Sequence, residues 1–219
     1  MRKRIFLFLL LLPLFSYSQV NIINRSLTDS TLNIAYVGVD NEIELTGLKS
    51  LSNLNFSTTN GRLTELGQNK YVLKLFEKSE FTLSLKDKAK VIAQKTFKAD
   101  VIPDPYPRFS SQYDSTKTPL TYYISFNNLI EDPVLRIEAP KFYFKNQWKI
   151  VSYRITLDGG AFNGTLITEF TVEGPEPTKE QVQKIRDHGS NTFMTVEDIR
   201  VIDPEGWTRR LVPIIINIK

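Results

Sequence analysis

The stretch Phe81-Thr82-Leu83-Ser84-Leu85-Lys86 decides the fold class, because apolar and polar side chains alternate along it without interruption. Successive side chains of a β-strand point to opposite faces, so a period of two predicts a strand buried on one face only. The same alternation recurs at 71–75 and 151–157, and turn-forming pairs such as Asn60-Gly61 and Asp40-Asn41 separate the runs. The sequence therefore predicts a mainly β protein of antiparallel strands.

The proline-rich segment 103–107 is the best candidate for a domain boundary, since three of its five residues are proline. Proline has no N–H for the ladder of a central strand and favours a stiff, extended connector. We therefore expect two tandem Ig-like β-sandwich domains, 19–102 and 108–219, joined by the connector 103–107. The strand-length runs on either side are spaced as in β-sandwich modules.

Residues 1–18 have the pattern of a cleavable signal peptide. Arg2, Lys3 and Arg4 precede the apolar run 5–15, and small residues at 16 and 18 predict cleavage before Gln19. The apolar run is much shorter than the roughly 20 residues that a transmembrane helix needs. We therefore expect an exported chain without a retained membrane anchor. The periplasm is its expected location, with the cell surface or the medium as the alternative.

Charge and composition narrow the classes of function. Three of the 28 Lys and Arg residues lie in the expected leader, so the mature chain, with 24 Asp and Glu, is close to neutral. This balance does not support nucleic-acid binding. The chain contains no cysteine, which excludes a disulfide, a thiolate metal site and a cysteine nucleophile.

One segment, 177–189, departs from the β pattern and predicts a short helix. Thr178 is a suitable N-cap, Gln181 completes a capping box, and Gly189 is a typical stop. The single histidine, His188, lies at the end of this helix. A cation there interacts well with the helix dipole and the free carbonyls, so we interpret His188 as structural.

No arrangement of residues predicts catalysis. Nucleophile-elbow and phosphate-loop motifs are absent from the sequence. Asp158 and Asp203 lie in turn contexts, whereas Glu197 and Asp198 are adjacent on a strand and would point to opposite faces. We expect no enzyme and no catalytic, cofactor or metal-binding residues. A hydrolase whose carboxylates meet only through the fold is the least favoured hypothesis.

Aromatic residues and arginine are enriched in protein interfaces, and this chain has two such groups near its C-terminal end. The residues that we predict to contact a partner are Trp207, Arg209, Arg210 and Trp148. The alternative is that the aromatic run Phe142, Tyr143, Phe144 and Trp148 fills the core. In the final strand, alternate residues from Val212 to Ile218 are expected to face the core. Leu211 and Ile215 leave open a strand buried on both faces.

Three stretches resemble the C-terminal periplasmic part of the GldM/PorM family, structural subunits of bacterial gliding-motility and type IX secretion machinery. The first is Tyr36-Val37-Gly38-Val39-Asp40-Asn41, and the second is the proline-rich junction 97–105. The third is the ending 189–219, in which the matching residues are Ile199, Pro204, Gly206, Arg210, Leu211, Pro213, Ile214 and Ile216. The order and spacing of the three stretches carry the resemblance, which spans about residues 20–219.

The resemblance implies distal β-sandwich modules that contact outer-membrane-associated ring components. Family members have an inner-membrane helix and two further domains before these modules, and here the expected leader stands in their place. We therefore expect a periplasmic module that binds components of an envelope secretion or gliding-motility complex. Family members dimerise, and the sequence leaves open whether this chain forms a homodimer. The alternative function is a secreted carbohydrate-binding β-sandwich that uses Trp148 and Trp207 as stacking platforms.

Overall fold

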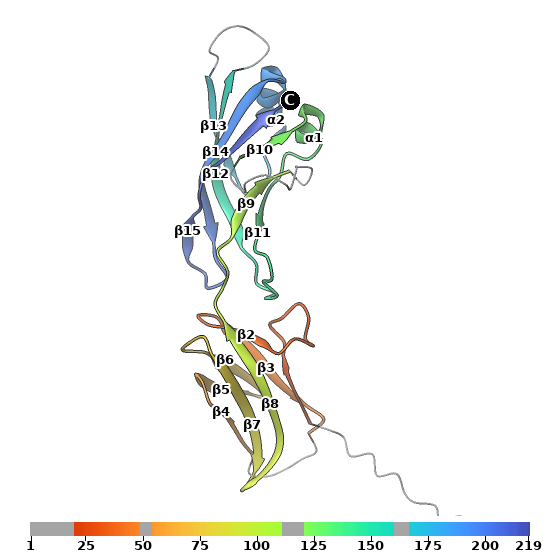
Figure 1. The fold of residues 1–219 in the computed structure, drawn as a ribbon, viewed down its shortest axis with the longest axis vertical. Coiled ribbons are helices and arrows are strands. Elements are labelled where there is room, and N and C mark those ends of the chain that lie inside the picture. Colours follow the sequence, from red (N-terminus) through yellow and green to blue (C-terminus); the bar gives the residue numbers. More distant parts are fainter. Residues whose placement is uncertain (1–19, 49–53, 111–120, 160–166) are drawn as a thin grey trace, which may run out of the picture.

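The computed structural model describes residues 20–48, 54–110, 121–159 and 167–219. The predicted leader, residues 1–18, lies outside these residues. The described chain forms two β units that follow one another along the long axis of the molecule (Figure 1). The predicted fold class, mainly β with tandem β-sandwich units, is confirmed.

The first unit is a sandwich of two four-stranded sheets, with orders β1-β3-β6-β5 and β2-β8-β7-β4. Buried residues on both sheets, among them Ile43, Leu73, Leu83 and Phe97, form one core. The alternation at 81–86 therefore marks β7, whose odd-numbered residues face this core. The strands are β1 (Asn21–Asn24), β2 (Ile34–Tyr36), β3 (Asp40–Thr46), β4 (Leu54–Thr58), β5 (Arg62–Gly67), β6 (Lys70–Lys74), β7 (Glu80–Asp87) and β8 (Lys90–Asp100).

The second unit is built on a six-stranded sheet of order β10-β16-β14-β12-β13, with β15 paired to the lower part of β14. A two-stranded sheet, β11-β9, and two helices supply buried residues to the same core as the inner face of this sheet. The elements are β9 (Tyr106–Phe109), β10 (Thr121–Ile124), α1 (Phe126–Glu131), β11 (Leu135–Glu138), β12 (Lys149–Gly159), β13 (Ile167–Glu173), α2 (Lys179–His188), β14 (Thr192–Ile202), β15 (Thr208–Arg210) and β16 (Ile214–Ile218).

Helix α2 follows the predicted capping chemistry. The Thr178 hydroxyl accepts a hydrogen bond from the Gln181 N–H, and the Gln181 side chain accepts one from the Thr178 N–H. Gly189 follows the last turn with φ of 73°, a conformation that favours glycine. Helix α1, capped by Ser125, is an additional short helix that the sequence analysis did not predict.

Two sequence expectations differ in detail from the structure. Asp40-Asn41, interpreted as a turn, begins β3 instead. The turn lies just before it, and the buried Asn41 amide donates hydrogen bonds to the carbonyls of Tyr36 and Val39. At the proline-rich segment, 101–105 contains no helix or strand, whereas Pro107 lies within β9 and pairs with Ile137.

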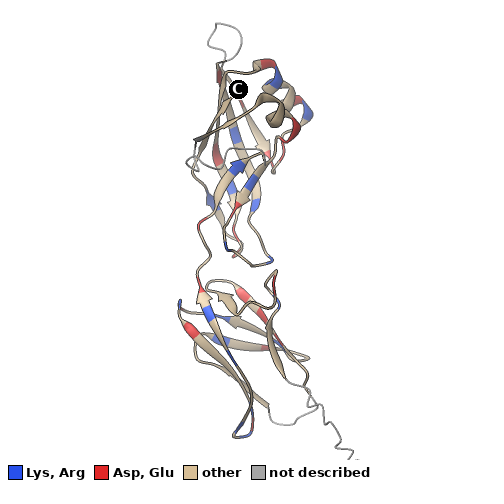
Figure 2. Cartoon of the chain, turned by 45° about the vertical axis from the view of Figure 1, so that its right-hand side comes forward, with Lys and Arg blue, Asp and Glu red and all other residues tan. Residues whose placement is uncertain are grey.

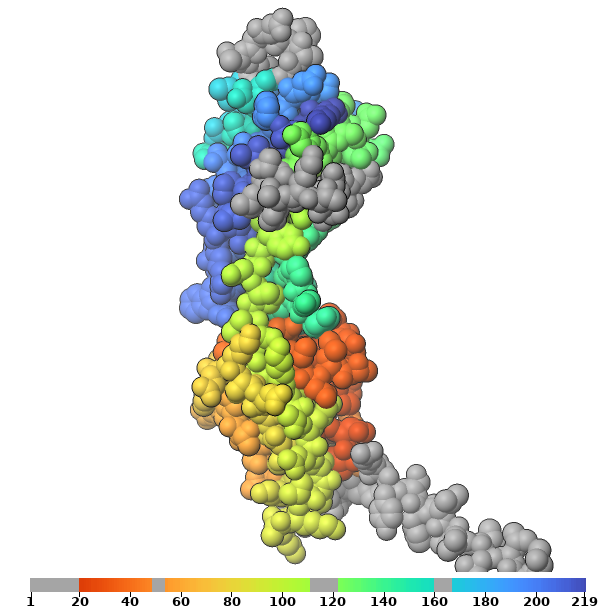
Figure 3. Space-filling model, viewed as in Figure 1, coloured from red at the N-terminus to blue at the C-terminus, as the bar shows by residue number. Residues whose placement is uncertain are grey.

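The aromatic run at 142–144 joins the two units. The rings of Phe142 and Phe144, 8% and 3% exposed, pack against Tyr36 with Leu27 and Val39 from the first unit. We call these five residues the clasp. Its side chains come from segments more than a hundred residues apart. These two segments meet at the waist of the molecule (Figure 3).

Hydrogen bonds reinforce the clasp. The Tyr36 hydroxyl accepts from the N–H of Tyr143 and donates to the carbonyl of Lys141, at 3.1 and 3.2 Å. Two backbone bonds of 2.7 Å flank the Leu27–Phe144 bridge: Thr28 N–H to the Tyr143 carbonyl, and Lys145 N–H to the Ser26 carbonyl. The two units are therefore held together by buried apolar area and by directional bonds, not only by the connector.

Candidate interaction surface

The turn of the final hairpin, between β14 and β15, is organised by one buried carboxylate. Asp203 is 3% exposed, and its Oδ1 accepts hydrogen bonds from the N–H groups of Glu205 (2.9 Å) and Trp207 (2.8 Å). Its other oxygen lies 2.5 Å from Nε of Arg209. Gly206, with φ of 92°, supplies the left-handed residue of the turn. Asp203 is therefore explained by the turn, as the sequence analysis expected.

The structure separates the four predicted contact residues into exposed and buried ones. Trp207 is 68% exposed at the tip of the hairpin, and Arg210 extends to Asp198 with an ion pair of 3.1 Å. Trp148 is only 9% exposed, and the Arg209 guanidinium lies 5.6 Å from the centre of its ring. Trp148 therefore cannot offer a ring face to a partner, whereas Trp207 can.

A larger surface, which the sequence analysis missed, is the outer face of the six-stranded sheet. The strand register places one row of side chains across all five strands of the main path. From β13 to β10 the row reads Ile167, Asp158, Phe193, Asn217 and Tyr123. Ile167 is 63% exposed and Phe193 56% exposed. We call the whole outer face of this sheet the open face. One half of it carries these apolar residues, and the other half carries charged residues.

The apolar part of the open face extends into the next row, where Ile215 lies opposite Thr195 and is 44% exposed. Tyr123 is also exposed, and the Lys219 ammonium lies 3.9 Å from the centre of its ring. The opposite face of the same strands carries fully buried residues such as Ile155 and Met194. The sheet thus buries one apolar face and exposes large apolar side chains on the other.

The other half of the open face is charged, and its charges are mutually paired. Arg154 lies between Glu169 (3.2 Å) and Glu197 (3.1 Å) on the neighbouring strands. Asp198 pairs with Arg200 and Arg210, and the hydrogen bond from Arg200 lowers the pKa of Asp198. Acidic and basic residues are likewise interspersed along both units (Figure 2).

Arg210, predicted as a contact residue, is therefore part of the open face through Asp198. The signal for the rest of the face was present in the sequence. Along their strands, buried and exposed positions alternate, and Thr192 and Ile214 are buried. Phe193 and Ile215 follow them at exposed positions, where a polar residue would be expected. An exposed apolar face and a strand buried on both sides give the same pattern, so the pattern alone could not identify the face.

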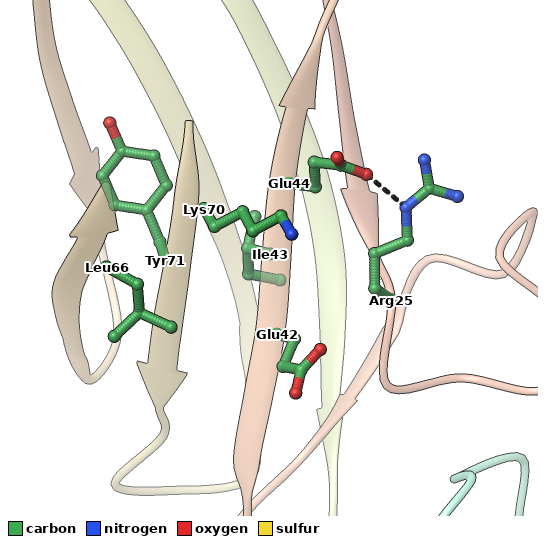
Figure 4. Close-up of a pocket in the computed structure, with 7 residues that line it drawn as sticks. All are labelled: Arg25, Glu42, Ile43, Glu44, Leu66, Lys70 and Tyr71. Atoms are coloured by element: carbon green, nitrogen blue, oxygen red, sulfur yellow. Dashed lines mark hydrogen bonds and ion pairs between the residues drawn. The ribbon is translucent and has the colours of Figure 1, made fainter. Parts of the chain in front are cut away.

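The first unit holds a shallow pocket of about 240 Å³ on the sheet β1-β3-β6-β5 (Figure 4). Glu42 and Glu44 of β3 lie beside it, with the exposed Leu66 and with Tyr71 on the far side. Arg25 and Glu44 form an ion pair of 2.5 Å. The lining combines two carboxylates, of which Glu44 is paired with Arg25, with Lys70, Tyr71 and the apolar Ile43 and Leu66.

The remaining residues considered for chemistry have structural partners. His188 is buried, with Nδ1 at 3.0 Å from the Gly159 carbonyl and Nε2 at 2.8 Å from the Thr168 hydroxyl. It therefore fastens the end of α2 to the β12–β13 hairpin rather than capping its own helix. Glu197 and Asp198 were expected to point to opposite faces, but both have arginine partners on the open face, because Asp198 has a φ of 48° at a register shift between β12 and β14. Within the described ranges, no group of three or more His, Asp or Glu residues could hold a metal ion.

Comparisons with known proteins match this chain to solved structures only. No protein-family model matches the chain, and no curated protein sequence matches it either. Among solved structures, the Yersinia pseudotuberculosis adhesin InvE aligns with 92% of this chain at 12% identity and a TM-score of 0.28. The insect immune protein hemolin aligns with 90% at 9% identity and a TM-score of 0.26, and a cytokine receptor complex with 90% at 11% and 0.25.

These alignments cover 60% of the adhesin chain, 47% of the hemolin chain and 95% of the receptor chain. The present chain thus spans about three fifths of the adhesin's length. At such TM-scores the likeness carries no functional argument, so the fold assignment rests on the strand order itself. No helix in the described part of the chain is long and apolar enough to cross a membrane.

Proposed function

We propose that this chain is an exported, non-enzymatic protein-interaction module that binds a partner protein through the open face of its second unit. The observation that carries the proposal is the group of exposed large apolar side chains on this face, which Asp158 and Asn217 separate within the row. Soluble monomers rarely expose contiguous large apolar side chains without a use for them. Here four such residues gather on one sheet face: Tyr123, Ile167, Phe193 and Ile215.

The charges of the open face favour a protein as the partner. Burying an unpaired charge is costly, whereas a paired charge with hydrogen bonds is tolerated in an interface. Arg154 is paired on both sides, and Arg200 and Arg210 share Asp198. A partner that covers these pairs would therefore bury no isolated charge there, whereas Asp158, which lies between Ile167 and Phe193 without an ion pair among the described residues, would need a donor from the partner. Its matching surface would be apolar at the centre and polar at the rim.

The cellular role is proposed from the resemblance to the GldM/PorM family. The order of three sequence stretches along residues 20–219 supports it, together with the expected leader. On this proposal the chain is periplasmic and binds components of an envelope secretion or gliding-motility complex. On this proposal it corresponds to the distal modules of the family and acts as a binding partner within that complex.

The proposal is tested by affinity purification of the tagged mature chain from its native envelope, followed by mass spectrometry. The informative comparison is between two variants. Phe193→Ser changes the centre of the open face, and Phe76→Ser changes a phenylalanine of the first unit that is even more exposed, 72% against 56%. We expect Phe193→Ser to reduce recovery of the partner about tenfold or more, as for a central apolar contact, and Phe76→Ser to retain it.

Two results would contradict the proposal. If both variants recover the same proteins in the same amounts, then the open face is not the binding surface. If the wild-type chain recovers no envelope protein, then the interaction role itself fails. Recovery of secretion or motility subunits would support the role inferred from the family resemblance.

Carbohydrate binding is the second candidate, and one observation favours it. Trp207 is 68% exposed at a turn held by Asp203, so its ring could stack on a sugar. Its predicted companion, Trp148, is buried and cannot contribute. Glycan-array binding that is lost in Trp207→Ala would support this candidate, whereas an array without binding to any glycan would remove it.

A further inference from the structure

Strand β8 of the first unit is much longer than one of its two neighbours. It pairs with β7 along its length, from Lys90 to Lys98. On its other side β2 pairs only with Lys98–Asp100. The preceding part of β8, residues 90–97, therefore has a neighbouring strand on one side only. We call the other side of this stretch the open edge.

The backbone groups of the open edge follow from the alternation of hydrogen bonds along the strand. On the β2 side, the N–H of Lys98 donates to the Asn33 carbonyl at 2.9 Å. On the β7 side, the N–H of Ala99 donates to the Ser79 carbonyl at 2.7 Å. Because successive residues alternate sides, the N–H and C=O groups of Gln94 and Thr96 point to the open edge.

Gln94 and Thr96 are exposed, and their outward backbone groups have no hydrogen-bond partner among the described residues. Such a row of unpaired N–H and C=O groups is a template for an additional strand. The stretch is also long enough, since strands are typically about five or six residues long. The open edge therefore has the backbone chemistry of an acceptor site.

A groove of about 340 Å³ runs beside the open edge, between β8 and β1. Its walls include Ile22 of β1 and the β8 residues 92–95. Within it, the Lys95 ammonium donates to the Ile22 carbonyl at 3.0 Å and lies 5.2 Å from the centre of the Phe97 ring. No carboxylate in the described part of the chain pairs with Lys95, and burial lowers its pKa.

We propose that the open edge of β8 accepts an extended segment of another protein as an additional strand, with an acidic side chain opposite Lys95. Strand addition of this kind draws affinity from backbone hydrogen bonds and specificity from the side chains beside them. A carboxylate near Lys95 would give a partly buried ammonium the opposite charge that it lacks. This pairing selects an acidic segment over a basic one.

The same charges disfavour a second copy of this chain as the occupant. Pairing two β8 edges would bring the lysines of both copies, Lys90 and Lys95, into one small ladder. Like charges opposite each other destabilise a sheet, and edge lysines are a common protection against self-pairing. The site lies in the first unit, away from the open face of the second. A failed test of strand addition at β8 would therefore leave the function proposed above unaffected, and the reverse also holds.

The test uses two synthetic peptides of about ten residues, a typical upper length for a strand. Both alternate valine and threonine, and they differ only at the central residue, which is glutamate in one and lysine in the other. Amide exchange of the mature chain is followed by NMR with each peptide. We expect the glutamate peptide to protect the amides of Gln94 and Thr96. Those of Lys95 and Phe97, which face β7, should be unchanged.

The affinity of the peptides should depend on the charge of their central residue and on the outward N–H of Thr96. The lysine peptide should bind about tenfold more weakly, a difference of about 1.4 kcal/mol. Lys95→Gln should abolish that difference. Thr96→Pro removes the outward N–H without touching the β7 ladder and should prevent protection, whereas the matched variant Thr96→Ala should retain it. If Thr96→Pro fails to fold, the Lys95→Gln comparison still decides the question.

Three outcomes would overturn the proposal. The glutamate peptide could give no protection at Gln94 and Thr96 at concentrations of about 1 mM, an affinity too weak for a specific site. Both peptides could bind equally well to the wild-type chain. Protection at these amides could also rise with protein concentration in the absence of peptide, which would identify a second copy as the occupant.

Discussion

Replacing Phe144 by alanine should uncouple the two units. The ring is 3% exposed and packs with its centre 5.9 Å from that of Tyr36 and 6.0 Å from that of Phe142. Truncating a buried phenylalanine typically costs about 3–5 kcal/mol, because burial is lost and a cavity remains. We expect about 3 kcal/mol here, since the waist can partly close over the gap.

The chain supplies a convenient assay for this prediction. Its two tryptophans, Trp148 and Trp207, both lie in the second unit, so tryptophan fluorescence reports that unit alone, whereas far-ultraviolet circular dichroism reports both. In urea, the two signals of the wild-type chain should coincide, and those of Phe144→Ala should separate into two transitions. The matched control is Tyr143→Ala, at an adjacent residue that is 36% exposed.

The reasoning fails if Phe144→Ala unfolds like Tyr143→Ala, with coincident signals and a similar midpoint. It also fails if the two signals of the wild-type chain already separate, because the clasp would then couple nothing. A separation seen only in Phe144→Ala would show that the clasp, and not the connector, makes the units unfold together.

Three further predictions concern single contacts. Asp203→Ala should destabilise the chain by about 1–3 kcal/mol in urea unfolding, because the turn N–H groups lose their acceptor and the Arg209 guanidinium loses its carboxylate. Thr178→Ala should cost about 1 kcal/mol by removing the N-cap of α2, measurable in the same way; an unchanged midpoint would contradict the capping role. The hydrogen bond from Lys78 holds the pKa of Asp100 at about 2, below its ordinary 3.8. A depressed carboxyl pKa contributes stability above about pH 4 that is lost as pH falls toward 2, and an NMR titration of Lys78→Ala should show that pKa raised toward 3.8.

Much of the fold could be predicted because its cause is local. The alternation at 81–86 and 151–157 requires no knowledge of distant residues, and the structure places these runs in β7 and β12 with one face buried. The capping box of Thr178 and Gln181 is equally local, and α2 begins where it predicts. Helix α1 escaped prediction because six residues carry too little periodicity to stand out from a strand-rich sequence.

The candidate surfaces could not be predicted with the same success, because they depend on what lies next to each strand. Phe142 and Phe144 face inward at the waist only because Tyr36, more than a hundred residues earlier, meets them there. Phe193 and Ile215 form a surface only because no layer of the described chain covers the outer face of their sheet. The open edge of β8 exists because the parallel strand β2 begins only at Ile34, opposite Lys98, and leaves residues 90–97 unpaired on that side. A local sequence pattern does not show which strand or loop lies beside another, so it could not predict any of these three features.

The clasp also determines how two weak contacts would add together. The open edge and the open face belong to different units, and the clasp fixes the distance and orientation between them. A partner that engages both surfaces would lose its translational and rotational freedom once, and the second contact would form at a high effective concentration. A flexible joint would dilute that advantage over many orientations. The five residues of the clasp would thus set a fixed spacing between the two surfaces. A partner whose own two contacts have that spacing would bind more tightly than one whose contacts do not.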